Sequence, residues 1–235
     1  MLFESRNEPR DMARSGALTE CMVKVYWWMA FALVVSGVCA WIVGSSEGLA
    51  EVFIGNRIVF FGLILAELGL VLGIGAGINK LSAATASALF ILYSALNGIT
   101  LSVVFLAYTQ SSIVLVFGIT AATFAATATF GAVTKTDLTR IGNLLVMALL
   151  GLIIASLVNF FMKSEALYWI CSYAGVAIFV GLTAYDVQKI KRAYRAIDPN
   201  DTENAGRIAV IGALELYLDF VNLFLYLLRI FGKRR

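Results

Sequence analysis

The chain has 235 residues, of which 60% are hydrophobic and only 14% are charged, and its formal net charge is +3. A soluble domain with an ordinary polar surface does not reach this apolar fraction, so the composition indicates a membrane protein with several spans. The sequence contains no histidine, the residue that most often supplies a metal ligand, a general base or a neutral-pH switch. Any sensing of protons must therefore fall to carboxylates, and we expect no tightly bound cofactor and no nucleic-acid partner.

Seven apolar runs are long enough to cross a hydrocarbon core, which takes roughly 20 residues. They lie at about Val25–Val43, Ile58–Ile78, Ala83–Ala107, Ile113–Phe130, Leu144–Phe161, Leu167–Tyr185 and Ile208–Ile230. Residues 1–24 mix both signs of charge and precede a run too long for a signal-peptide core, so we interpret them as a retained N-terminal tail. The expected fold is an all-α membrane protein, with residues 25–235 forming a single seven-transmembrane-helix bundle in the lipid bilayer. A monomer is favoured.

Lysine and arginine are unevenly distributed between the two ends of this bundle. The N-terminal tail holds four and the connection between the sixth and seventh runs holds five, whereas the first and fifth connections hold one each. Because positive residues favour the cytoplasmic side, we expect a multi-pass protein with a cytoplasmic N-terminus. Arg229, Lys233, Arg234 and Arg235 would then lie outside, unless a half-inserted last helix returns the C-terminus to the cytoplasm.

Two helix faces in the first half of the chain indicate close packing. Glycines recur every four residues from Gly69 to Gly77 in the second run, as two overlapping GxxxG steps that favour the approach of another helix. Tyr93, Asn97 and Thr100 share one face of the third run. These polar residues either form hydrogen bonds between helices or line a polar passage.

Three acids stand inside the apolar runs: Glu67 in the second, and Glu215 and Asp219 in the seventh. An ionised side chain at the bilayer centre costs at least about 2.5–3.5 kcal/mol, so such residues are rare and functional by default. Glu215, Asp219 and Asn222 fall at i, i+4 and i+7 on one helix face, which cannot face lipid. Glu67 needs a cation, and Arg229 is the first choice.

Asp186 stands where the sixth run meets a positively charged segment, in the stretch YDVQKIKRAYR. The residue is either the wet end of a helix or one half of a buried pair with Asp219. Counting at about 1.5 Å per residue places Asp219 roughly 16 Å below the start of the seventh run, deeper than Asp186. The depths agree only if the seventh helix enters late, near Ala213, or if a water-filled vestibule reaches the pair, so the residues alone leave both alternatives open.

Two carboxylates in contact inside a low-dielectric bundle cannot both ionise cheaply, so such a pair shares a proton and titrates as a unit. Loss of the proton leaves repulsive like charges, which a nearby cation can offset. A transient Ca²⁺, which prefers carboxylate oxygen, could bind between Asp186 and Asp219. Lys80 and Arg192 are the candidate side-chain cations.

The segments YDVQKIK at 185–191 and ALELYLDFVNLFLYLLRIFG at 213–232 resemble the two C-terminal signatures of the Bax inhibitor motif family of seven-helix membrane proteins. The stretch KLSAATASALFILYSALNGITLSVVFLAYTQSSI, followed by TKTDLTRIGN, is similar to its bacterial members, so the resemblance runs from Glu67 onward. It implies that Asp186 and Asp219 form a hydrogen-bonded pair linked to a calcium leak that responds to pH. Glu215 is not part of the family pattern, and its role stays open.

The resemblance favours a pH-sensitive leak channel for Ca²⁺, and for protons, in the bacterial cell (inner) membrane, gated by the buried aspartate pair. The alternative is an integral-membrane regulator of a membrane-bound protease or of membrane-protein quality control. Some bacterial relatives are associated with such a protease, and the polar N-terminal tail would suit a cytoplasmic partner. No enzyme activity is predicted, because the surroundings of the two aspartates lack intramembrane aspartyl protease signatures such as GxGD.

Overall fold

The computed structural model of the chain describes residues 8–77, 80–198 and 201–235. Seven helices in these residues are long and apolar enough to cross a membrane, which confirms the predicted fold class. They are α1 (Glu8–Ser45), α3 (Arg57–Gly77), α4 (Ala83–Ala107), α5 (Gln110–Val133), α6 (Thr139–Met162), α7 (Glu165–Ala196) and α8 (Thr202–Phe231). The short helix α2 (Glu47–Ala50) and the π-helical turn η1 (Glu51–Gly55) connect α1 to α3.

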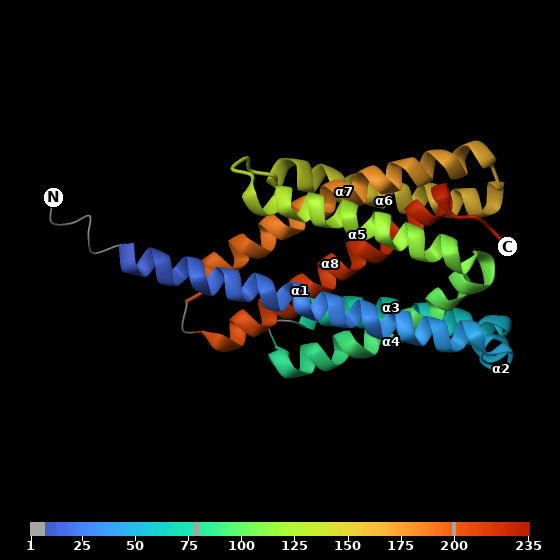
Figure 1. Cartoon of the computed structure of the whole chain (residues 1–235), viewed down its shortest axis with the longest axis horizontal. Coiled ribbons are helices and arrows are strands. Elements are labelled where there is room, and N and C mark those ends of the chain that lie inside the picture. Colours follow the sequence, from blue (N-terminus) through green and yellow to red (C-terminus); the bar gives the residue numbers. More distant parts are fainter. Residues whose placement is uncertain (1–7, 78–79, 199–200) are drawn as a thin grey trace.

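The long helices run roughly along one axis of the molecule, and α1 begins at the opposite end from the one where α8 ends (Figure 1). The last helix, α8, is central: it contacts α1, α4, α5 and α7, and it is the most buried of the seven. By contrast α3 packs mainly on α4 and α6 mainly on α7, and both leave most of their apolar surface uncovered. Such surfaces suit contact with lipid, because lipid tails are as apolar as the side chains.

Polar side chains start three of the crossing helices. Ser82, Ser164 and Asp201 precede α4, α7 and α8, and each side-chain oxygen accepts a hydrogen bond from the backbone N–H three residues later. These bonds satisfy groups that the first turn of a helix leaves unpaired. At Asp201, the hydrogen bonds from Asn204 hold the pKa of the carboxyl below its usual range. The connections are thus fixed by local sequence signals.

The first and last helices differ from the sequence-based expectation in extent. Helix α1 begins at Glu8 rather than at Val25, so residues 8–24, expected as a tail, are continuous with the first crossing helix; residues 1–7 lie outside the described residues. Cys21 and Val25 are both buried in the main core. Helix α8 is continuous from Thr202 to Phe231, with no break at which the last helix could turn back.

The glycines of α3 do not form the predicted packing face. A Cβ atom placed at Gly69 or Gly73 would meet no other atom within 4 Å. The close approaches of the bundle occur elsewhere. A Cβ at Gly98 of α4 would lie 2.5 Å from the carbonyl oxygen of Ser36 in α1, and one at Gly131 of α5 would overlap the backbone of α7. Glycine therefore permits close contact between α1 and α4 and between α5 and α7.

Candidate functional site

Asp186 of α7 and Asp219 of α8 meet between the two helices. Their carboxyl groups are in hydrogen-bonding contact. Asp219 is only 4% exposed, and its Oδ2 atom has no hydrogen-bond partner among the described residues. The Asp186 side chain is 13% exposed. The structure thus places the two aspartates together in an enclosed position, rather than leaving Asp186 at the wet end of a helix.

The two aspartates meet although they lie at different distances from the ends of their helices. Asp219 lies roughly 26 Å along α8 from its first residue, whereas Asp186 lies roughly 15 Å from the end of α7. The first turn of α8 lies beside the start of α4, where Glu203 accepts a hydrogen bond of 2.8 Å from the backbone N–H of Ala83. The contact between Asp186 and Asp219 is thus formed although the depths counted from the sequence differ.

A lysine and a third acid adjoin the pair. The Nζ atom of Lys189 on α7 lies 2.5 Å from Oε1 of Glu215 on α8 and 3.9 Å from Oδ1 of Asp186. We call Asp186, Lys189, Glu215 and Asp219 the acid cluster. One ammonium group here faces three carboxyl groups. Because an unpaired charge is costly in a low-dielectric interior, the cluster requires a bound proton or a further cation.

Neither cation predicted beside the pair lies there. Lys80 is exposed beyond the end of α3, and its side chain forms no ion pair with a described residue. Arg192 pairs with Asp137 instead. The residue that sequence reasoning missed is Lys189, although its position three residues after Asp186 places both on one face of the helix.

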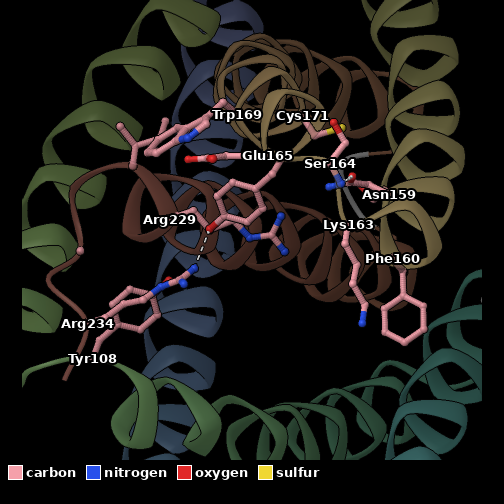
Figure 2. Close-up of a pocket in the computed structure, with 14 residues that line it drawn as sticks. Tyr108, Asn159, Phe160, Lys163, Ser164, Glu165, Trp169, Cys171, Arg229 and Arg234 are labelled. Carbon is pink, nitrogen blue, oxygen red and sulfur yellow. Dashed lines mark hydrogen bonds between the residues drawn. The ribbon is translucent and has the colours of Figure 1, made fainter.

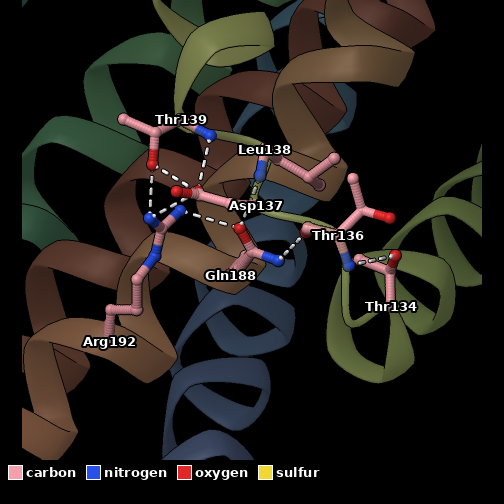
Figure 3. Close-up of polar contacts among 7 residues, drawn as sticks. All are labelled: Thr134, Thr136, Asp137, Leu138, Thr139, Gln188 and Arg192. Atoms are coloured by element: carbon pink, nitrogen blue, oxygen red, sulfur yellow. Dashed lines mark hydrogen bonds and ion pairs between the residues drawn. The ribbon is translucent and has the colours of Figure 1, made fainter.

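Figure 3 shows the contacts of Arg192. Its guanidinium donates to Oδ1 of Asp137 at 2.9 Å, to the hydroxyl of Thr139 and to Oε1 of Gln188. Gln188 Oε1 also accepts a hydrogen bond of 2.9 Å from the backbone N–H of Leu138. Hydrogen bonds from Thr139, and the charge of Arg192, hold the pKa of Asp137 below its usual range. These contacts fasten the α5–α6 connection to α7, apart from the acid cluster.

Glu67 does not pair with Arg229, so the predicted ion pair is wrong. The Glu67 carboxylate accepts hydrogen bonds from Nδ2 of Asn97 at 3.1 Å and from the hydroxyl of Thr100 at 2.9 Å. The Cζ atom of Arg229 instead lies over the rings of Tyr168 and Tyr226, at 5.7 Å and 5.1 Å from their centroids. The polar face predicted on the third apolar run thus supplies the partners of Glu67.

Asn97 extends the contacts of Glu67 into the core. Its Oδ1 atom accepts a hydrogen bond of 2.9 Å from the hydroxyl of Tyr217, and that hydroxyl lies 2.6 Å from Oγ of Ser36. We call Glu67, Asn97, Thr100, Tyr217 and Ser36 the Glu67 network. It joins α3, α4, α8 and α1, and the Tyr217 side chain within it is fully buried.

The last predicted site residue, Asn222, belongs to neither group: its amide donates to the carbonyl of Leu218 in its own helix at 2.8 Å. Among the described residues, no three or more histidine, cysteine, aspartate or glutamate side chains are grouped so as to hold a metal ion. A Ca²⁺ at the aspartate pair would therefore draw the rest of its oxygen ligands from elsewhere.

Comparisons with known proteins place the chain in a family. The model of the family described as inhibitors of apoptosis-promoting Bax1 matches residues 18–235, so the similarity begins well before Glu67. The inner membrane protein YbhL of Escherichia coli strain K12 is 51% identical over 230 residues, which cover 98% of each chain. An uncharacterized protein of Borreliella burgdorferi is 49% identical over 214 residues, covering 91% of this chain and 92% of its own. The uncharacterized protein RP147 of Rickettsia prowazekii is 42% identical over 220 residues, which cover 93% of this chain and 91% of its own. Because the family match spans nearly the whole chain, the protein belongs to the Bax inhibitor-1 family.

Proposed function

We propose that the protein is a pH-sensitive Ca²⁺ leak channel that is gated by the Asp186–Asp219 pair. The observation that carries the proposal is an enclosed acid, Asp219, that touches a second carboxyl while one of its own oxygens lacks a hydrogen-bond partner. Acids inside a bundle are costly and mark ion or proton pathways. The resemblance of the two C-terminal segments to the family signatures supports the same assignment.

We place the channel in a bacterial inner membrane, with the N-terminus in the cytoplasm. The 51% identical relative from Escherichia coli is named an inner membrane protein, which supports the location. The distribution of lysine and arginine supports the orientation. The acid cluster then lies in the cytoplasmic half of the bundle, because the connection from α7 to α8 is at the end where α1 begins (Figure 1).

The gating mechanism rests on one shared proton. While Asp186 and Asp219 share it, the two carboxyl groups attract each other; after its loss, two like charges repel each other between α7 and α8. Lys189 is the nearest cation, but it is held by Glu215. Ca²⁺ prefers carboxylate oxygen, so it competes with the proton for the same atoms. This competition makes the Ca²⁺ leak depend on pH.

The test is Ca²⁺ flux into liposomes that contain the purified protein. Asp219→Asn should reduce the flux, and Asp186→Asn should abolish its dependence on pH between about 5 and 8, the range that histidine would otherwise report. Asp137→Asn removes an exposed acid near the same end and should leave both properties unchanged. Wild-type flux in a folded Asp219→Asn variant would remove this residue from the pathway. A wild-type protein that conducts no Ca²⁺ would refute the channel and favour the alternative, a regulator of a membrane-bound protease.

A further inference from the structure

A large cavity lies at the end of the bundle opposite the acid cluster, where α6 ends and α7 begins. Its volume is about 920 Å³, within the range of pockets that hold small ligands. Figure 2 shows Lys163, Arg229 and Arg234 around this space, together with one acid, Glu165. The cavity is therefore lined by three cations that the aspartate pair does not use.

These three cations are not neutralised by the protein. Neither Lys163, Arg229 nor Arg234 forms an ion pair with any residue of the described ranges, and Glu165 forms none either. The ion pairs of Lys189, Arg192 and Arg207 lie at the other end of the bundle. With three cations and one acid, the lining carries a net positive charge, and such a cavity concentrates anions. The ligand that suits it is an anion.

Arg234 is held in place at the edge of the cavity. Two backbone hydrogen bonds, of 3.0 and 3.1 Å, join residues 233 and 235 to the α4–α5 connection, and Tyr108 and Arg234 face each other as an antiparallel bridge. The guanidinium of Arg234 donates to the hydroxyl of Tyr168 at 3.2 Å. Hydrogen bonds to Tyr108 and Tyr168 raise the pKa of Arg234. Its positive charge is thus both fixed in position and permanent.

Aromatic side chains line the same cavity. The Arg229 guanidinium lies 5.7 Å from the ring centroid of Tyr168, and Trp169 is a further lining residue. Tyrosine and tryptophan concentrate where a membrane protein meets the lipid headgroups. On one side Phe160 lines the cavity and is 72% exposed, at the end of the largely uncovered helix α6. The cavity therefore has the aromatic lining typical of the level of the lipid headgroups, and it borders the apolar outer surface of α6.

We propose that this cavity binds the phosphate group of an anionic phospholipid, with Arg229, Arg234 and Lys163 as its cations. Arginine presents a planar fork of N–H donors that matches phosphate oxygens, and basic pockets between membrane helices bind lipid headgroups. The acyl chains would leave along Phe160 and α6. A free phosphate offers the same oxygens to the cations but gains nothing from this apolar side.

The test measures the thermal midpoint of the full-length protein in nanodiscs. Unfolding is monitored by the reaction of Cys21, which is buried and does not line the cavity, with a fluorescent thiol reagent. Adding phosphatidylglycerol to phosphatidylcholine should raise the midpoint of the wild type. The double variant Arg229→Gln/Arg234→Gln should need roughly 25-fold more phosphatidylglycerol for the same rise, since each cation near a membrane surface contributes about fivefold to binding.

Two further variants make the result decisive. Arg235→Gln removes the same charge from a neighbouring exposed residue that does not line the cavity, and it should respond as the wild type does. Lys163→Gln alone should need roughly fivefold more anionic lipid, so that the proposal stays testable if the double variant does not fold in pure phosphatidylcholine. An equal response of the wild type and both cavity variants, or an equal loss in Arg235→Gln, would overturn the proposal.

A second arm separates a lipid from a free anion. Inorganic phosphate is added to the protein in phosphatidylcholine nanodiscs, without anionic lipid. We expect little change in the midpoint at concentrations where phosphatidylglycerol stabilises the protein. Stabilisation by inorganic phosphate that equals the lipid effect, and that is lost in Arg229→Gln/Arg234→Gln, would overturn the lipid assignment and show a site for soluble phosphate.

Discussion

Replacing Glu67 by leucine should loosen α3 from the bundle. Helix α3 packs mainly on α4, and Glu67 supplies two hydrogen bonds across that contact, to Asn97 at 3.1 Å and to Thr100 at 2.9 Å. Hydrogen bonds between membrane helices average roughly 0.6 kcal/mol each, with a maximum near 1.7. The expected loss is therefore about 1–2 kcal/mol, or roughly 2–8 °C in the thermal midpoint of a chain of this size.

A double-mutant cycle in detergent identifies which residue Glu67 contacts. Thr100→Val removes the hydroxyl donor and keeps the shape of the side chain, so the cycle of Glu67→Leu with Thr100→Val should give a coupling energy of about 0.6 kcal/mol. The cycle of Glu67→Leu with Arg229→Gln should give about zero, because Arg229 contacts neither Glu67 nor its partners. Coupling to Arg229 and none to Thr100 would refute this reasoning and restore the ion pair that the sequence suggests.

Two further predictions concern the packing and the α5–α6 connection. Gly131→Leu should lower the thermal midpoint strongly, because its Cβ would overlap the backbone of Ala184, whereas Gly73→Ala should leave it unchanged or raise it, by up to about 1 kcal/mol of stability. A strong loss in Gly73→Ala would instead reveal a helix packed on that face. Because the folded pKa of Asp137 is depressed, its stabilisation is present above the unfolded pKa and is lost as pH falls through the folded one. The midpoints of the wild type and Asp137→Asn should therefore differ above about pH 5 and converge only as pH falls below the depressed pKa of Asp137; a difference that persists in strong acid would contradict this.

The number of crossing helices could be predicted from the sequence, but their ends could not. An apolar run of roughly 20 residues identifies a crossing whatever its neighbours are. The sixth run was expected to end at Tyr185, yet α7 continues to Ala196. Hydropathy reports where a helix leaves the apolar layer, and the charged residues beyond that point are themselves good helix formers. The same reasoning applies to α1, which begins before its apolar run.

The sequence suggested that Asp186 and Asp219 form a pair, but counting residues along the helices could not establish that they meet. Its formation depends on how α7 and α8 pack against each other, which no local pattern reveals. Lys189, in contrast, could have been found from its spacing to Asp186, but the search for a cation looked to more distant positions. The glycines from Gly69 to Gly77 led to a wrong prediction of a packing face for a related reason. A GxxxG pattern permits another helix to approach closely, but it does not show that one does.

The partners of the acids follow from which face of each helix the bundle covers. Helix α8 is enclosed by α1, α4, α5 and α7, so it can carry Glu215 and Asp219 where α7 supplies Lys189 and a second carboxyl. Helix α3 is covered mainly by α4, so an acid on it is tolerated only where α4 offers donors, and Asn97 and Thr100 are those donors. A carboxylate can be satisfied by neutral N–H and O–H groups as well as by a cation. In a bundle of this kind, opposite charge alone therefore does not identify the partner of a buried acid. The face of the helix that its neighbours cover has to be known first.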